Sequence, residues 1–157
     1  ATMHASNSYQ ALNRILSFYP VEVRATMLGD LSSGLRAVVS QRLLRTVSGA
    51  RLPAVEVLLN TKLVAELIEQ GNFSGVREAM TSSIAEGSQT FEAAIAALVV
   101  AGLVERDEGM AHADSPTNLL WRLQNDFVGT TRPTTAPPAE DPDDTPSFTE
   151  IVLDVTH

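Results

Sequence analysis

Apolar residues near the start of the chain recur at intervals of three and four, which is typical of a helix with one buried face. Four positions share that face: Leu12, Ile15, Leu16 and Tyr19. Asn7 or Ser8 can cap this helix, and Pro20 follows its end, where a helix cannot easily continue. The preceding residues 1–3 read as the end of a buried strand that runs directly into the helix.

Two further short helices are expected over residues 21–28 and 31–38, with Gly29 and Gly34 between and within them. Gly29 to Gly34 has the glycine spacing of a phosphate-binding loop. It is followed by Leu35-Arg36, however, where such a loop needs Lys and then Ser or Thr. The strand that should precede the loop is also missing, so we interpret this stretch as a joint between helices.

The period then changes from helical to alternating. Residues 39–47 and 52–59 are rich in Val and Leu and flank Ser48-Gly49-Ala50-Arg51, a pattern that predicts a β-hairpin. Pro53, near the start of the second run, suits an edge or first position of a strand.

The chain is predicted to be helical again after residue 60. Asn60 or Thr61 can cap the first of these helices, Gly71 can end it, and Ser74 can cap the next. Apolar spacing from Thr90 predicts another helix. The expected ranges are about 61–70, 74–85, 90–103, 106–113 and 116–123. Residues 129–146 are rich in Thr, Pro and Asp and should be disordered, and residues 148–155 regain strand character.

Composition and charge argue against two classes of protein, those that bind nucleic acid and those that span a membrane. The chain has 157 residues, no Cys and a net charge of −8. Residues 1–128 carry 10 Lys/Arg against 13 Asp/Glu, whereas residues 129–157 carry 1 against 6, so most of the acidity lies in the tail. Nucleic acid is not an expected partner, because binding it needs clustered Lys and Arg. No apolar run approaches the roughly 20 residues of a membrane span.

Common catalytic patterns are missing. The imidazoles are His4, His112 and His157, and no two of them have the spacing of zinc ligands, so no metal site is expected. A Gly-x-Ser-x-Gly motif of serine hydrolases is also absent. His4, at the expected strand end, and Arg14, ten residues later on the helix, remain as candidate site residues. A His at a strand end can also be purely structural.

The residues around His4 resemble the His box of the type IV pilus retraction ATPases, the PilT/PilU family of secretion ATPases. That box reads A-T-L-H-x-N/T-x-A-x-x-A-x-x-R-x-x-x-x-F-P, and the matching residues here are Ala1, Thr2, His4, Ala11, Arg14 and Pro20. Further likenesses follow in the same order along the chain, at residues 35–44, 51–61, 89–92, 101–104 and 113–115. The Ser-Gln-Arg-Leu and Ala-Asp-Ser stretches lean toward the PilU-like branch. Lys62 departs from the family, which usually has Pro there.

The resemblance implies an α-rich α/β fold. Residues 1–60 would be the C-terminal part of a RecA-like P-loop ATPase core, made of the strand end and the hairpin. Residues 61–128 would be a helical C-terminal domain, 129–146 a disordered acidic linker, and 147–157 a possible docking strand. The phosphate-binding loop and the acidic motifs would lie upstream of Ala1, so the chain alone should be inactive.

By the same resemblance, the parent protein is a homo-hexamer that hydrolyses ATP with magnesium to power pilus retraction and twitching motility. His4 would sense the γ-phosphate, with Arg14 beside it as the second catalytic-site residue. Expected partners are a paralogous retraction ATPase and the pilus platform protein of the inner membrane, which places the protein in the cytoplasm at the pilus base.

Two alternatives stay open. One is the C-terminal part of a pilus-extension or type II secretion ATPase, although such proteins commonly carry a Cys-rich metal insertion and this chain has no Cys. The other is a helical adaptor without enzymatic activity, which would bind a partner through the strand at residues 148–155.

Overall fold

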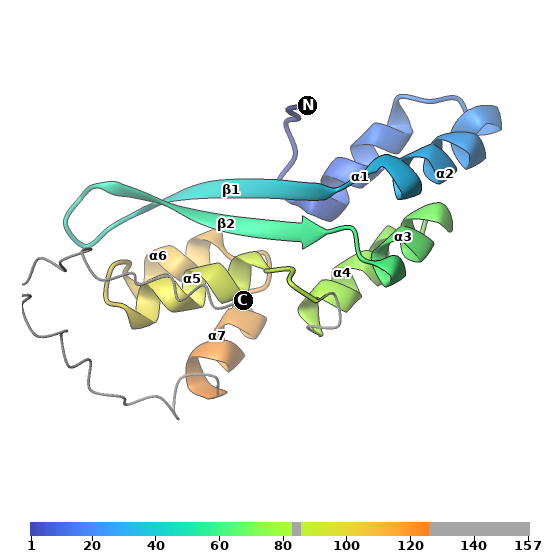
Figure 1. Ribbon diagram of the computed structural model, residues 1–157. Helices are drawn as coiled ribbons and strands as arrows, with labels where there is room; N and C mark the ends of the chain where they lie inside the picture. The colour runs from blue at the N-terminus through green and yellow to red at the C-terminus, as the bar shows by residue number, and fades with distance from the viewer. Residues whose placement is uncertain (83–85, 126–157) are drawn as a thin grey trace, which may run out of the picture.

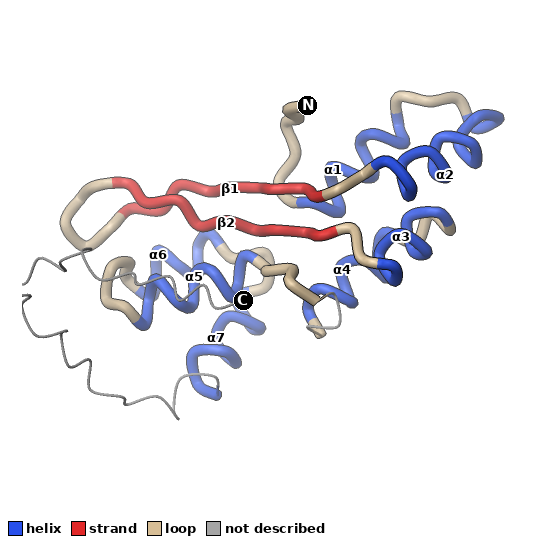
Figure 2. The backbone as a smooth tube through the Cα atoms, viewed as in Figure 1, coloured by secondary structure: helices blue, strands red, loops and turns tan. Residues whose placement is uncertain are grey.

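The computed structural model describes residues 1–82 and 86–125. Within them, a two-stranded antiparallel hairpin of β1 (Ala37–Arg45) and β2 (Arg51–Leu59) carries helices along one face and at one end, as Figure 1 shows. The chain is thus helix-rich with a small sheet (Figure 2). The helices are α1 (Ser8–Ser17), the 3-10 turn η1 (Val21–Val23), α2 (Arg24–Gly34), α3 (Lys62–Glu69), α4 (Phe73–Thr81), α5 (Phe91–Val100), α6 (Arg106–His112) and α7 (Pro116–Asn125).

The predicted hairpin is confirmed, with β1 beginning two residues earlier than expected. Its register runs from the pair Ala37 and Leu59 to the pair Arg45 and Arg51. Burial alternates along both strands, because successive side chains point to opposite faces. Leu44 and Leu58 point inward and are fully buried, whereas Val39 points outward and is exposed. The hairpin therefore offers one face to the helices.

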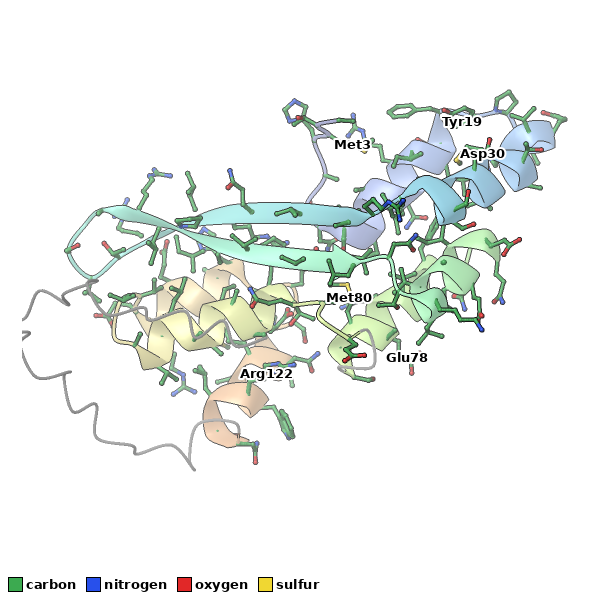
Figure 3. All side chains as sticks on the ribbon, in the orientation of Figure 1. Met3, Tyr19, Asp30, Glu78, Met80 and Arg122 are labelled. Carbon is green, nitrogen blue, oxygen red and sulfur yellow. The ribbon has the colours of Figure 1, made fainter. Side chains whose placement is uncertain are left out.

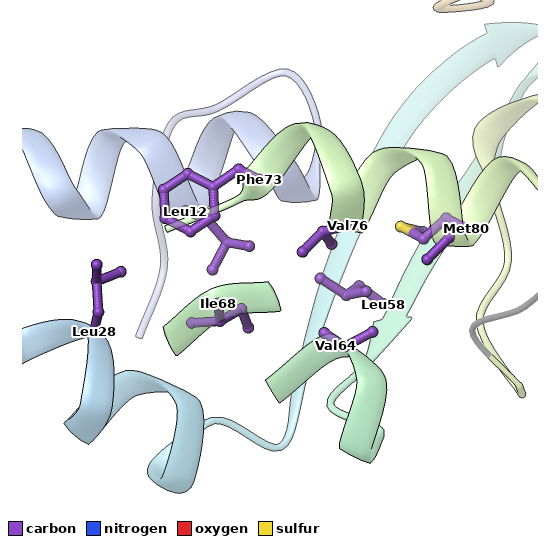
Figure 4. Packing of buried hydrophobic residues seen from close by; sticks show 9 residues of the cluster. Leu12, Leu28, Leu58, Val64, Ile68, Phe73, Val76 and Met80 are labelled. Carbon is purple, nitrogen blue, oxygen red and sulfur yellow. The ribbon is translucent and has the colours of Figure 1, made fainter. Parts of the chain in front are cut away.

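Two apolar cores pack against that face. The first core is formed by the helices α1, α2, α3 and α4 and by the end of β2, as Figure 4 shows. Its buried members are Leu12, Leu28, Leu58, Val64, Ile68, Phe73, Val76, Ala79 and Met80. The second core joins the hairpin to α5 and α7, and its buried members are Leu44, Ala54, Phe91, Ile95, Ala96, Val104 and Leu119. The hairpin contributes to both cores and so connects them.

Several helix ends agree with the sequence: Asn7 and Thr61 are among the predicted caps, and Thr90 begins the predicted range of its helix. The side chains of Asn7, Thr61 and Thr90 each accept a hydrogen bond from a backbone N–H in the first turn of α1, α3 and α5. Gly71 and Gly102 follow α3 and α5 with φ of 67° and 68°, the left-handed conformation that a helix end favours in glycine. Local sequence therefore sets these boundaries.

Four local predictions are wrong. The expected break at Gly29 and the helix over 31–38 are replaced by α2, which runs through Gly29 and ends at Gly34. An isolated glycine costs a helix only about 1 kcal/mol, which packing readily offsets. Residues 37 and 38 belong instead to β1, because β2 is available to pair with them. The cap of α4 is Asn72 rather than Ser74.

The fourth concerns residues 1–3, which form no strand. A strand requires a hydrogen-bonded neighbour, and β1 and β2 pair with each other, not with this segment. The domain boundary at residue 60 stays a prediction; the first core combines Leu12 and Leu58 with Ile68 and Phe73 across it. The linker and terminal strand predicted for 129–157 lie outside the described residues.

Candidate functional site

The structure brings the two predicted site residues together. His4 lies in the segment before α1, and Arg14 lies in the last turn of α1. The Arg14 guanidinium reaches back along the helix, and its Nη1 donates a hydrogen bond to the backbone carbonyl of His4 at 3.0 Å. Both side chains are exposed. Arg14 therefore fixes the backbone at His4 while the imidazole stays accessible.

An open hollow of about 480 Å³ surrounds this contact. All of its lining residues except Ala5 have polar side chains: His4, Ser6, Gln10, Asn13, Arg14 and Ser17. Guanidinium, imidazole, amide and hydroxyl groups can all donate hydrogen bonds, and the lining contains no carboxylate. This donor set suits an anion such as a phosphate group. It does not suit magnesium, which prefers carboxylate oxygens.

Buried polar groups hold the segment that carries His4 through hydrogen bonds to Asn7 and Ser8. Asn7 and Ser8 have exposed fractions of 1% and 0%. The Asn7 Oδ1 accepts the Gln10 N–H at 3.0 Å, and its Nδ2 donates to the Asp114 carboxylate at 2.8 Å. The Ser8 N–H donates to the Glu56 carboxylate at 2.7 Å. The start of α1 is thus attached to β2 and to the turn between α6 and α7.

Glu56 is unusual among the inward-facing residues of the hairpin, because it is a buried acid with an exposed fraction of 5%. Burial raises the pKa of its carboxyl group above the ordinary 4.5, because the charged form loses hydration. The hydrogen bonds from Ser8 oppose this increase, the nearby Asp114 charge adds to it, and Arg42 opposes it.

Arg42 points inward from β1 and connects several elements. Its Nη1 donates to the His112 carbonyl at 2.6 Å, and its Nη2 donates to the Ser6 carbonyl at 2.8 Å and also contacts the Asp114 carboxylate. The guanidinium lies 4.0 Å from the centre of the Phe91 ring. We call Asn7, Arg42, Glu56 and Asp114 the polar cluster.

None of these four residues was predicted from the sequence to belong to the site. The sequence did contain a sign that two of them matter. Arg42 and Glu56 occupy inward positions of strands whose other inward positions are largely apolar. A charged side chain on the buried face of a strand needs a partner. The sequence could not say that the partners would be Asp114 and the backbone around Ser6, which are 72 and 36 residues from Arg42.

Another hollow, of about 520 Å³, lies between α1 and α2. Its lining is mostly apolar: Ile15, Tyr19, Val23, Thr26, Met27, Asp30 and Leu31. Figure 3 shows Tyr19 and Asp30 at the end of the molecule that α1 and α2 form. Met3 lies on the N-terminal segment, on the opposite side of the hairpin from Arg122. With few polar groups, this hollow is a poorer candidate for binding an anion.

Across residues 1–82 and 86–125, no group of three or more His, Asp or Glu side chains is placed to hold a metal ion. None of the helices in the same residues is both long enough and apolar enough to cross a membrane.

No family model matches the chain. It is 41% identical over 125 residues to the type IV pilus ATPase PilU of Pseudomonas aeruginosa, an alignment that covers 79% of this chain and 33% of that protein. It is 27% identical over 117 residues to the type IV pilus retraction ATPase PilT of the same organism, covering 74% of this chain and 34% of PilT.

Solved structures of ATPases also match this chain in fold. The pilus retraction motor PilT with bound ADP superposes with a TM-score of 0.68 at 25% identity, over 76% of this chain and 33% of that one. The Yersinia pseudotuberculosis ATPase DotB superposes with a TM-score of 0.61 at 21% identity, over 70% of this chain and 29% of DotB, which is a likeness of fold. The chain spans about a third of the length of the relatives it matches. These matches together support a chain of the PilT/PilU family of type IV pilus ATPases.

Proposed function

We propose that this chain is part of a hexameric ATPase that powers type IV pilus retraction, and so twitching motility, by hydrolysing ATP. The observation that carries the proposal is the contact between Arg14 and the His4 carbonyl, beside a hollow lined by hydrogen-bond donors. That arrangement occurs in a chain 41% identical to a pilus ATPase. The fold neighbour PilT binds ADP.

In this proposal the bound nucleotide supplies the phosphoryl group that is transferred to water, and magnesium bound elsewhere in the parent would supply positive charge. His4 lies near the γ-phosphate and donates a hydrogen bond to the phosphoryl group as it is transferred, rather than to the resting nucleotide. The Arg14 guanidinium keeps the His4 backbone in place by donating a hydrogen bond to the His4 carbonyl. The described hollow contributes no carboxylate, so in this proposal the magnesium ligands and the phosphate-binding loop come from elsewhere in the parent protein. This chain alone is therefore expected to be inactive.

The proposal includes a place in the cell and a set of partners. Residues 1–60 would complete a RecA-like core, and residues 61–128 would be the helical C-terminal domain. The parent would assemble as a homo-hexamer in the cytoplasm, at the inner-membrane base of the pilus. There it would act with a paralogous retraction ATPase and the platform protein of the pilus.

The substitution His4→Ala in the full-length protein tests this function. A hydrogen bond to a charged group is worth about 1.5–3 kcal/mol, so kcat should fall roughly tenfold to a hundredfold. Nucleotide affinity should stay nearly the same, because His4 is proposed to sense the γ-phosphate rather than to hold the nucleotide. Steady-state ATPase assays and titration with a fluorescent ATP analogue measure the two effects.

The control is Gln41→Ala, which removes an exposed side chain from the outward face of β1, outside the hollow. Its turnover should match that of the unmodified protein. Unchanged turnover in His4→Ala would refute the proposed role of His4.

A further inference from the structure

Three consecutive residues after His4 are each held by a different polar side chain from a distant part of the chain. The Ser6 carbonyl accepts from Arg42 at 2.8 Å, the Asn7 amide donates to Asp114 at 2.8 Å, and the Ser8 N–H donates to Glu56 at 2.7 Å. Capping of α1 needs only the Asn7 Oδ1. The other contacts fix where the segment lies relative to the rest of the molecule.

Arg42 and Asp114 form the centre of this arrangement. One Asp114 oxygen contacts the Arg42 guanidinium, and the other accepts from the Asn7 amide. Arg42 in turn holds carbonyl groups from both sides, Ser6 before α1 and His112 at the end of α6. The pair therefore joins the His4 segment to the junction of α6 and α7 through the hairpin.

The chemistry of the pair favours a fixed geometry. The side chains are only 18% and 21% exposed, and the guanidinium lies over the Phe91 ring, so water competes weakly for the contacts. A planar guanidinium donates in fixed directions, and Lys cannot replace it where several acceptors are held at once. Charge-assisted hydrogen bonds are about twice as strong as neutral ones.

We propose that Arg42 and Asp114 are positioning residues for His4: they hold the segment at Ser6 and Asn7 so that the imidazole and the Arg14 contact keep one orientation in the hollow. This inference rests on the proposed function, in which His4 acts during ATP hydrolysis. Arg42 and Asp114 do not line the hollow themselves. They act on the reaction through the backbone that carries His4.

Arg42→Lys and Asp114→Asn in the full-length protein test the inference. Both keep the size of the side chain close to the original, and Arg42→Lys also keeps the charge. A misplacement of about 1 Å can cost up to a hundredfold in rate, so kcat should fall roughly tenfold to a hundredfold. The KM for ATP should change less than about threefold, because the hollow keeps its own side chains. A purely structural ion pair would lower thermal stability without lowering the turnover of folded protein.

Hydrogen exchange followed by mass spectrometry gives a readout independent of activity. In both variants, amide exchange in the peptide covering residues 5–12 should quicken about tenfold or more, as expected when roughly 1.4 kcal/mol of local stability is lost. The matched control is Arg51→Lys, an exposed arginine on β2 of the same hairpin. It should leave kcat and the exchange of residues 5–12 unchanged.

The outcomes separate the two ideas. Reduced kcat with an unchanged KM and faster exchange at residues 5–12 supports the positioning role. If His4→Ala lowers turnover but Arg42→Lys and Asp114→Asn do not, the positioning role is overturned and the proposed function stands. If none of the three variants changes turnover, the role of His4 falls and the positioning role falls with it. If the unmodified protein hydrolyses no ATP, the proposed function fails, and unchanged exchange in the two variants would then overturn the positioning role by itself.

Discussion

Glu56 shows how one residue can join stability to the position of the site. Folding removes this carboxyl group almost completely from water, and its main compensation is the hydrogen bond from the Ser8 N–H. Because burial is the largest effect, the folded protein holds the Glu56 proton more tightly than the unfolded chain does. Ionising Glu56 next to Asp114 in the folded protein therefore costs stability.

Glu56→Gln should change how stability depends on pH. A raised pKa in the folded state means that the stability linked to Glu56 is fully present below the unfolded pKa, near 4.5, and is lost as pH rises through the folded pKa. Glutamine cannot ionise and can still accept the Ser8 N–H. The difference in unfolding free energy, variant minus unmodified, should therefore be more favourable to the variant at pH 7 than at pH 4.

Urea denaturation at pH 4 and pH 7 measures this difference. Glu66→Gln, an exposed glutamate on α3, serves as the control and should show no comparable change between the two pH values. A difference for Glu56→Gln that is the same at both pH values would contradict the raised pKa.

At the scale of elements, α6 packs unusually closely against α5 at Gly109. A Cβ built on Gly109 would lie 2.9 Å from Ile95 Cγ2 and 3.1 Å from Val99 Cγ2. Ile95 is fully buried in the second core and has little room to move. Glycine is thus required here by the distance between two helices rather than by its backbone conformation.

Gly109→Ala should destabilise the protein although alanine is the better helix former. Overpacking a core costs about 1–3 kcal/mol, which exceeds the gain of up to about 1 kcal/mol in helix propensity. Gly29→Ala in α2 is the matched control, since a Cβ there meets nothing within 4 Å. That variant should be as stable as the unmodified protein or more stable.

Thermal denaturation of both variants, followed by circular dichroism, tests the comparison. The expected order of midpoints is Gly29→Ala, unmodified protein, Gly109→Ala. A Gly109→Ala protein with a raised midpoint would show that α6 can move away from α5 at little cost.

For the whole molecule, the hairpin is the shared part of two cores. Leu58 belongs to the first core, and Leu44 and Ala54 belong to the second, all on the same face of the sheet. The polar cluster spans the same boundary, from Asn7 before α1 to Asp114 before α7. Loss of one core should therefore weaken the other.

Ile68→Ala tests this coupling, because Ile68 is fully buried in the first core. Such a truncation costs about 2–5 kcal/mol. If the cores unfold together, amide exchange should quicken in α5 of the second core as well as in α3 and α4. Hydrogen exchange by mass spectrometry measures both regions in one experiment. Faster exchange confined to α1–α4 would indicate that the two cores are independent.

The sequence determined the features that depend on neighbouring residues. Asn7, Thr61 and Thr90 cap their helices, and the alternating strands form the hairpin, because a cap or a two-residue period is complete within a few residues. The spacing of His4 and Arg14 was also local enough to place both on one hollow, since a helix beginning near Asn7 returns a long side chain toward its own start.

Tertiary structure decided what depends on distant partners. α2 continues through Gly29, and residues 37 and 38 join β1, because contacts with α3 and β2 outweigh local preference. Residues 1–3 form no strand because neither strand of the hairpin lies beside them to accept their hydrogen bonds. The polar cluster also needed the fold: Arg42 and Asp114 are 72 residues apart, and only the packing of α6 and α7 under the hairpin brings their charges together.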